Sequence, residues 1–180
     1  MVPKLEKCNP VTCKWVLCLK KKSDGNIDRF KDRLVARGFS QNYGLDYEET
    51  FSPVAKMVTV RSLISLASFK GWNLWQLDVK NAFLYGELDR EVFMEQPHGF
   101  AYKQFPSHVC RLKKALYGLK QAPRAWYGKV AQYLIFCGFR VSDSDSSLFI
   151  KLESSVHLLI LLYVDDMIIT GDNESKIFLI

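Results

Sequence analysis

The sequence predicts an α+β fold, because the elements that its pattern indicates do not alternate regularly between strand and helix. Near the N-terminus, apolar residues recur at every second position, which is typical of a half-buried strand. Two later stretches carry apolar residues at helical spacing, and the last third holds three apolar runs in succession. The expected order is hairpin, helix, strand, basic segment, helix and strands. A length of 180 residues suits one domain or a piece of a larger protein.

The first expected element is a β-hairpin. Ser23-Asp24-Gly25-Asn26 is typical of a turn, because Gly tolerates positive φ and Asp and Asn bond to nearby backbone. The first strand precedes this turn and residues 27–39 return after it. Basic residues at odd positions of the returning strand share one face and form a basic ribbon: Arg29, Lys31, Arg33 and Arg37. Apolar residues of the first strand also share a face: Cys13, Trp15, Leu17 and Leu19.

A helix over residues 59–71 and a strand over residues 74–79 come next. Thr59 is placed to cap the helix, and Gly71 suits the position just after its end. The helix has an apolar stripe of Val60, Leu63, Ile64 and Ala67. One side of the strand carries Leu74, Gln76 and Asp78. An acidic turn and a short strand are expected between Glu87 and Glu95.

The remaining elements are a basic segment, a second helix and three strands. Residues 103–129 contain Lys and Arg but no Asp or Glu. The helix starts near Pro123, which suits the first helical position, and stops at Gly138. Its stripe is Trp126, Val130, Tyr133, Leu134 and Cys137. The strands are expected over residues 148–152, 156–164 and 167–170.

Composition excludes several classes of protein. A hydrophobic fraction of 48% excludes a disordered chain, and a net charge of +6 favours a polyanionic partner. Five cysteines without a C-x-x-C pair argue against a disulfide scaffold, and the row Cys8, Cys13, Cys18 lacks a fourth zinc ligand. We see no signal peptide and no stretch that could span a membrane, and we expect an intracellular location, cytoplasmic or nuclear.

Two adjacent carboxylates, Asp165 and Asp166, lie between two apolar runs. Burying such charges is costly unless they are paired or bind a metal, and Mg²⁺ prefers carboxylate oxygens. The alternative is a solvated hairpin tip, for which Asp is a common residue. Asp78, at the end of another strand, supplies a third carboxylate. Three such groups suit a site for two Mg²⁺ ions that activate a 3′-hydroxyl and stabilise leaving pyrophosphate.

Five sequence blocks, covering about residues 13 to 172, resemble the reverse transcriptase of copia-type LTR retrotransposons. The YVDD block contains both adjacent aspartates and is weak evidence alone, but five blocks in the family's order are specific. The blocks are CKWV (13–16) with RLVARGF (33–39), DYEETFSPV (46–54), QLDVKNAFLYG (76–86) running on to MEQP (94–97), ALYGLKQAPRAWY (115–127) and YVDD (163–166).

The resemblance implies an RNA-directed DNA polymerase with a right-hand fold, cut short before the thumb. Fingers would cover about residues 1–56 and 87–122, and palm residues 57–86 and 123–180. The implied partners are an RNA or DNA template with a primer, and dNTP substrates. The implied cofactor is Mg²⁺, two ions, with Mn²⁺ as a substitute. The implied catalytic and metal-binding residues are Asp78, Asp165 and Asp166, with Asp165 the more direct ligand.

Nucleotide-binding residues also follow from the resemblance. Phe83 matches the aromatic gate that excludes a ribose 2′-hydroxyl, although a core aromatic is the alternative. Gln121 matches a glutamine that contacts the incoming nucleotide. Lys31, Arg33 and Arg37 lie where the family's fingers strand meets triphosphate or template, and a solvated strand face is the alternative for each. Asp32 departs from the pattern and adds an acid inside the basic ribbon.

The family's chain continues through a thumb, a connection and an RNase H domain, so we expect the sequence to be a fragment. The apolar residues near its end, Ile177 to Ile180, agree with that expectation. Two competing hypotheses remain. One is a catalytically silent transposon remnant with nonspecific nucleic-acid binding. The other is a basic nucleic-acid-binding module unrelated to polymerases.

Overall fold

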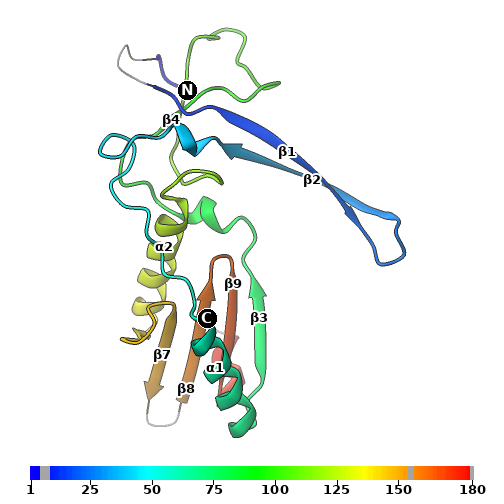
Figure 1. The fold of residues 1–180 in the computed structure, drawn as a ribbon, viewed down its shortest axis with the longest axis vertical. Helices are drawn as coiled ribbons and strands as arrows, with labels where there is room; N and C mark the ends of the chain where they lie inside the picture. The colour runs from blue at the N-terminus through cyan, green and yellow to red at the C-terminus, as the bar shows by residue number, and fades with distance from the viewer. Residues whose placement is uncertain (5–8, 154–155, 179–180) are drawn as a thin grey trace. The chain divides into compact units, whose positions relative to one another are not determined.

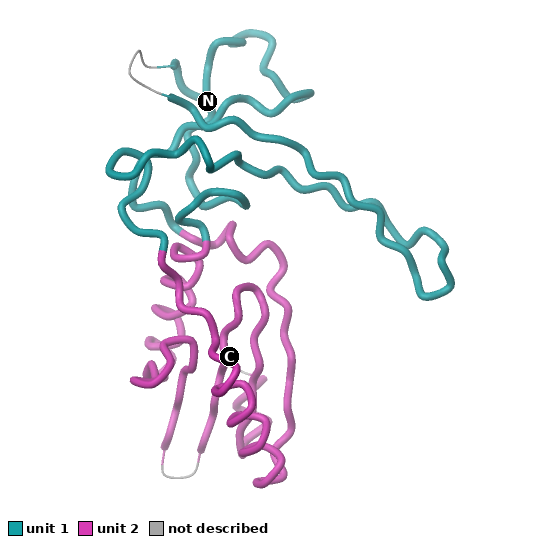
Figure 2. The backbone as a smooth tube through the Cα atoms, in the orientation of Figure 1, with its two compact units in different colours: residues 1–50, 87–122 teal, residues 51–86, 123–180 magenta. Residues whose placement is uncertain are grey.

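The computed structural model of this chain describes residues 1–4, 9–153 and 156–178, so Cys8, Leu179 and Ile180 lie outside the described residues. The chain forms two compact units, coloured separately in Figure 2. The first unit comprises Met1–Thr50 and Glu87–Ala122, and the second comprises Phe51–Gly86 and Pro123–Ile180. No helix among the described residues is long and apolar enough to cross a bilayer.

An antiparallel hairpin of β1 (Cys13–Lys21) and β2 (Ile27–Ala36) dominates the first unit and extends well beyond its base (Figure 1). Its turn contains Gly25 at φ 86°, and the Asp24 carboxylate accepts a hydrogen bond from the Asn26 backbone N–H. The predicted hairpin is therefore confirmed. Strand β2 ends earlier than expected, because a 3₁₀ turn, η1 (Gly38–Ser40), follows it.

The rest of the first unit is mostly irregular. Strands β4 (Phe93–Met94) and β5 (Cys110–Arg111) pair with each other, and Val11 forms a bridge to Met94. The predicted short strand before Glu95 is confirmed as β4, whereas the sequence pattern did not indicate β5.

The second unit contains a five-stranded antiparallel sheet in the order β3-β9-β8-β7-β6, and Figure 1 labels β3, β9, β8 and β7. The four predicted strands of this unit are confirmed within a few residues, and the short β6 was not predicted. The strands are β3 (Leu74–Asp78), β6 (Arg140–Val141), β7 (Leu148–Glu153), β8 (Val156–Tyr163) and β9 (Asp166–Gly171).

Two helices pack on opposite faces of this sheet, because alternate residues of β8 contact different helices. Helix α2 (Ala122–Phe136) contributes the buried Trp126, Val130 and Leu134 to a core that includes Leu158, Ile160 and Leu162. Helix α1 (Met57–Lys70) contributes Leu63 to a smaller cluster with Leu159 and Leu161. A 3₁₀ turn η2 (Ala82–Tyr85) and a short helix α3 (Glu174–Ile177) complete the unit.

The predicted start of α1 was wrong and its predicted end was right. The helix begins two residues earlier than expected, and its N-cap residue, Lys56, makes no side-chain capping bond. Thr59 is not the cap, because its hydroxyl donates to the Asp145 carboxylate at 2.6 Å. Gly71 has φ 68°, the left-handed conformation predicted for the residue after the helix.

Candidate active site and nucleic-acid interface

The tip of the β8–β9 hairpin carries the adjacent carboxylates. Tyr163 pairs with Asp166 across the two strands, which leaves Val164 and Asp165 as a two-residue loop. Val164 has φ 55°, as the first residue of such a loop requires, although a β-branched side chain disfavours that conformation. This backbone costs on the order of 1–3 kcal/mol, so surrounding contacts must hold it.

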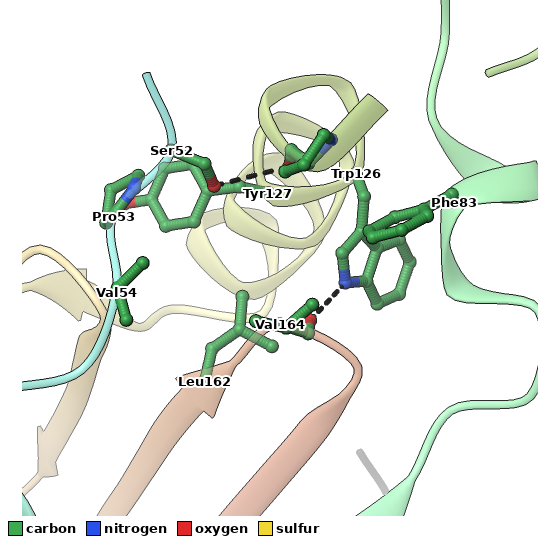
Figure 3. Close-up of a pocket in the computed structure, with 9 residues that line it drawn as sticks. Ser52, Pro53, Val54, Phe83, Trp126, Tyr127, Leu162 and Val164 are labelled. Carbon is green, nitrogen blue, oxygen red and sulfur yellow. Dashed lines mark hydrogen bonds between the residues drawn. The ribbon is translucent and has the colours of Figure 1, made fainter. Parts of the chain in front are cut away.

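Two hydrogen bonds hold the tip from different elements. The Trp126 indole N–H donates to the Val164 carbonyl at 2.7 Å, and the Val79 backbone N–H donates to the Asp165 carbonyl at 2.8 Å. Figure 3 shows the indole directed at the Val164 carbonyl. Helix α2 and the end of β3 therefore fix the loop that carries the two carboxylates.

The strand register places the third predicted carboxylate beside this tip. Asp78, the last residue of β3, is the direct partner of Asp166 in β9. Directly opposed residues of antiparallel strands share one face, with Cβ atoms about 4.5–5.5 Å apart. Gln76, two residues earlier on that face, donates from Nε2 to Asp166 Oδ1 at 3.2 Å. Sequence reasoning put Gln76 on the side of Asp78, but nothing in the sequence indicated its bond to Asp166.

The three aspartates fit a divalent cation by residue type and backbone placement. Their carboxylate oxygens are the donors that Mg²⁺ prefers, and Asp78 is solvent-exposed at a strand end. As the side chains stand, no three His, Cys, Asp or Glu residues of the described ranges are grouped closely enough to hold a metal ion. Metal binding would therefore require the carboxylates to turn toward one another.

Phe83 lies in η2 and is partly buried against the α2 side of the sheet. Its ring lines a cavity of about 40 Å³ together with Trp126 and Val164. Figure 3 shows the Phe83 and Trp126 rings close together. The other lining residues are Ser52, Pro53, Val54, Pro123, Tyr127 and Leu162. Phe83 is thus near the carboxylate-bearing loop, and the gate role stays a prediction.

The β1–β2 hairpin of the first unit has two unlike faces. Residues paired across the strands share a face, so Val16 accompanies Arg33 and Cys18 accompanies Lys31. Asp32 is paired with Leu17 on the opposite face, so it does not interrupt the basic ribbon as expected. The basic face carries Lys14, Lys20, Arg29, Lys31 and Arg33. Arg37 lies beyond the end of β2, so its expected place on the strand face was wrong.

Gln121 is only 3% exposed. Its Oε1 accepts from the Gln41 side chain at 3.0 Å, and its Nε2 donates to the Asp46 carbonyl at 3.0 Å. Gln41 Oε1 in turn accepts from the Lys120 backbone N–H at 2.8 Å. Both ends of the Gln121 amide are therefore engaged inside the first unit. A direct contact with a nucleotide stays a prediction that would require these bonds to break. Sequence reasoning did not identify Gln41.

A mixed α/β chain with carboxylates at one end of a sheet and a separate basic hairpin has the features of a protein that acts on nucleic acid. A family model described as reverse transcriptase (RNA-dependent DNA polymerase) matches residues 1–178. The chain therefore belongs to the reverse transcriptase family, and its relatives place it in the copia type. Members of this family generally use divalent metal ions.

Three curated relatives show the range of similarity. The Retrovirus-related Pol polyprotein from transposon RE2 of Arabidopsis thaliana is 51% identical over 163 residues, which is 91% of this chain and 11% of the relative. That from transposon TNT 1-94 of Nicotiana tabacum is 46% identical, covering 93% and 13%. The Transposon Ty1-DR4 Gag-Pol polyprotein of Saccharomyces cerevisiae is 32% identical, covering 87% and 9%. The chain thus spans about a tenth of these relatives. No solved structure matches it significantly.

Proposed function

We propose that this chain is the fingers and palm part of an RNA-directed DNA polymerase encoded by a copia-type retrotransposon. The first unit would be the fingers and the second the palm. The observation that carries the proposal is the strand register that opposes Asp78 to Asp166, beside Asp165. Membership of the reverse transcriptase family supports it independently.

In this proposal Asp78, Asp165 and Asp166 hold two Mg²⁺ ions. When bound, the ions would supply activation of the primer 3′-hydroxyl and neutralise the charge of the leaving pyrophosphate. The chain's own contribution is to hold these carboxylates in one place. The Trp126 bond to Val164 and the Val79 bond to Asp165 limit the freedom of the loop, so the carboxylates need only side-chain rotation to converge.

Other residues of the proposed enzyme orient its substrates. The Phe83 ring, held near the carboxylate-bearing loop, would exclude a ribose 2′-hydroxyl by its volume. Lys31, Arg33 and Arg37 would hold phosphates of the template or of the incoming dNTP. The Gln121 amide would act directly on the nucleotide only after leaving its bonds to Gln41 and Asp46.

Primer extension on an RNA template tests the proposal. We expect extension by the purified chain with MgCl₂ and loss with EDTA. Asp78→Asn and Asp165→Asn should each reduce the rate roughly 100-fold or more, because charge stabilisation of the transition state is lost. The matched control is Asp143→Asn, an exposed aspartate of the same unit, which should extend normally. Equal extension by Asp165→Asn and the wild type would refute the proposed site.

A catalytically silent remnant is the second candidate, and the separated carboxylates favour it. It would give no extension with any variant, yet it would bind nucleic acid with a steep dependence on salt. The two candidates are distinguished by measuring extension and binding on the same preparations.

A further inference from the structure

The end of strand β2 and the residues just after it form backbone hydrogen bonds with residues 115–121 of the same unit. The Ala36 N–H donates to the Tyr117 carbonyl at 2.7 Å, and the Gly38 N–H donates to the Gly118 carbonyl at 3.2 Å. A Cβ on Gly118 would lie 2.0 Å from the Ala36 oxygen, and Gly118 has φ 90°. Only glycine allows this approach, so Tyr117 is held at a fixed place against β2.

The fixed position of Tyr117 puts its ring beside Arg33. The Arg33 guanidinium carbon lies 5.7 Å from the ring centroid, within the range of a cation–π contact. Val35, on the same face of β2, also points at this segment, since its Cγ1 lies 2.8 Å from the position of a Gly118 Cβ. The basic face of the hairpin therefore meets the 115–121 segment at its base.

Arg33 has a donor without an acceptor. Its Nε is buried and has no hydrogen-bond partner in the part of the chain that the structure describes. A buried N–H without an acceptor is unfavourable, so the Arg33 guanidinium gains free energy when it turns to present Nε and a terminal N–H together to a bound acceptor. Phosphate oxygens match the planar fork, and the neighbouring Lys31 and Arg29 on the same face favour an anion there.

We propose that Tyr117 is a positioning residue that holds the Arg33 guanidinium for a phosphate group. Arg33 is then the phosphate-binding residue among the three basic residues expected on the fingers, and the Gln41–Gln121 pair anchors the segment that carries Tyr117. The phosphate belongs either to a nucleic-acid backbone or to a nucleotide triphosphate. The identity of the molecule that carries the phosphate rests on the proposed function. The presence of a phosphate-binding site at Arg33 does not.

Fluorescence anisotropy with the full 180-residue chain tests the inference in two arms. One arm uses a labelled RNA–DNA primer–template and the other uses a fluorescent dATP derivative, each from 50 to 300 mM NaCl. The variants are Tyr117→Phe, Tyr117→Leu, Arg33→Ala, Arg33→Lys and the double variant Tyr117→Leu/Arg33→Ala. The control is Phe30→Leu, which removes an exposed ring from the opposite face of the hairpin. Thermal unfolding of each variant verifies folding.

We expect Tyr117→Leu to weaken binding roughly 3- to 10-fold in at least one arm, whereas Tyr117→Phe stays within about twofold of the wild type. Arg33→Lys should also weaken binding, because an ammonium lacks the fork. Arg33→Lys leaves the 115–121 segment unchanged, so this variant still tests the inference if Tyr117→Leu does not fold. The double variant should bind no worse than Arg33→Ala. In the primer–template arm, Arg33→Ala should reduce the salt slope by about 0.9, the loss of one phosphate contact.

Weakening in the primer–template arm alone assigns the phosphate to nucleic acid, and weakening in the nucleotide arm alone assigns it to the triphosphate. Three results would overturn the inference. The first is additive effects of Tyr117→Leu and Arg33→Ala in the double variant. The others are normal binding by both Tyr117→Leu and Arg33→Lys, and no binding by the wild type in either arm. Failure of the proposed polymerase is distinguishable, because it would show as no primer extension by the wild type while binding in either arm still weakens in Tyr117→Leu and Arg33→Lys.

Discussion

The hairpins β1–β2 and β8–β9 share a topology and differ in what surrounds them. In β1–β2, even large apolar residues are exposed, with Leu17 at 74% and Phe30 at 76%. In β8–β9, most of β8 is buried between helices α1 and α2. The first hairpin is held near its base by backbone bonds from Ala36 and Gly38, whereas the second is also held at its tip by Trp126.

This difference suits two different tasks. An exposed ribbon with several positive charges can follow a flexible polyanion, because most of its phosphate contacts tolerate variable positions, with Arg33 at its base as the proposed exception. The proposed sharing of metal ions by carboxylates requires fixed positions, and a buried hairpin with a pinned tip suits that requirement. The four predictions that follow test the comparison, from the largest expected effect to the smallest.

Gly118→Ala should remove the anchor of the exposed hairpin. The new Cβ would overlap the Ala36 oxygen, and the left-handed backbone at Gly118 disfavours alanine, so we expect a loss of about 4 kcal/mol or more. Gly128→Ala is the matched control: this helical glycine has no atom within 4 Å of its added Cβ and should gain about 1 kcal/mol. Chemical denaturation measures both, and equal stability of the two variants would contradict the anchoring role.

Ile160→Ala and Leu17→Ala compare the two hairpins directly. Ile160 is fully buried in β8, so its truncation should cost about 3 kcal/mol through lost burial and a residual cavity. Leu17 is mostly exposed in β1, and its truncation should change stability by less than about 0.5 kcal/mol. Urea unfolding curves of both variants provide the measurement. A large loss in Leu17→Ala would mean that the first hairpin is covered in solution.

Asp145→Asn should weaken the attachment of α1 to the sheet unit. Burial raises the pKa of the Asp145 carboxyl, but hydrogen bonds from the Ser147 and Thr59 hydroxyls and from the Lys56 and Ser147 backbone N–H groups lower it more, to about 2. A folded-state pKa below the unfolded value of 3.8 stabilises the fold above pH 4, and that stability disappears as pH falls toward 2.

The shift at Asp145 corresponds to roughly 2 kcal/mol, so Asp145→Asn should lose about that much at pH 7 and flatten the pH dependence of stability between pH 4 and 2. Unfolding free energies are measured across this range for Asp145→Asn and for the control Asp143→Asn. Asp143 is a nearby exposed residue, so its substitution should leave stability at the wild-type value. If the stability of Asp145→Asn depended on pH as that of the wild type does, the Asp145 carboxylate would not be the source of the pH dependence between pH 4 and 2.

Trp126→Phe should loosen the tip of the buried hairpin with the smallest cost in stability. The substitution keeps an aromatic ring, deletes the N–H that donates to the Val164 carbonyl and removes part of a buried side chain, at a total cost of about 1–2 kcal/mol. If the tip positions the carboxylates, the rate of primer extension should fall more than stability does. Tyr133→Phe, which keeps the ring of an exposed α2 residue, is the control. Normal extension by Trp126→Phe would mean that the tip keeps its shape without this bond.

The sequence predicted those features that depend on residues close in the chain. Period-two alternation located β1, apolar runs located β7, β8 and β9, and Gly71 correctly marked the end of α1. Thr59 failed as a cap because its partner, Asp145, lies 86 residues away. Alternation also placed the apolar residues of β1 on one face, but not whether anything covers that face, which depends on packing between distant segments.

The candidate site divides in the same way. The carboxylates were recognised from their motifs, whereas the opposition of Asp78 to Asp166 is a strand register that spacing does not determine. The burial of Gln121 depends on Gln41, 80 residues earlier. No local pattern indicates that pair, so the bonds that hold the Gln121 amide inside its unit could not be predicted from the sequence.

The left-handed backbone of Val164 has a consequence for protein engineering. Glycine would adopt φ 55° without the penalty of a branched side chain, so a screen for thermostability alone would select Val164→Gly. The same change would give more conformations to the loop that carries Asp165. A screen that selects only for thermal stability would therefore favour a change in the loop of the proposed active site, so it should measure primer extension in parallel.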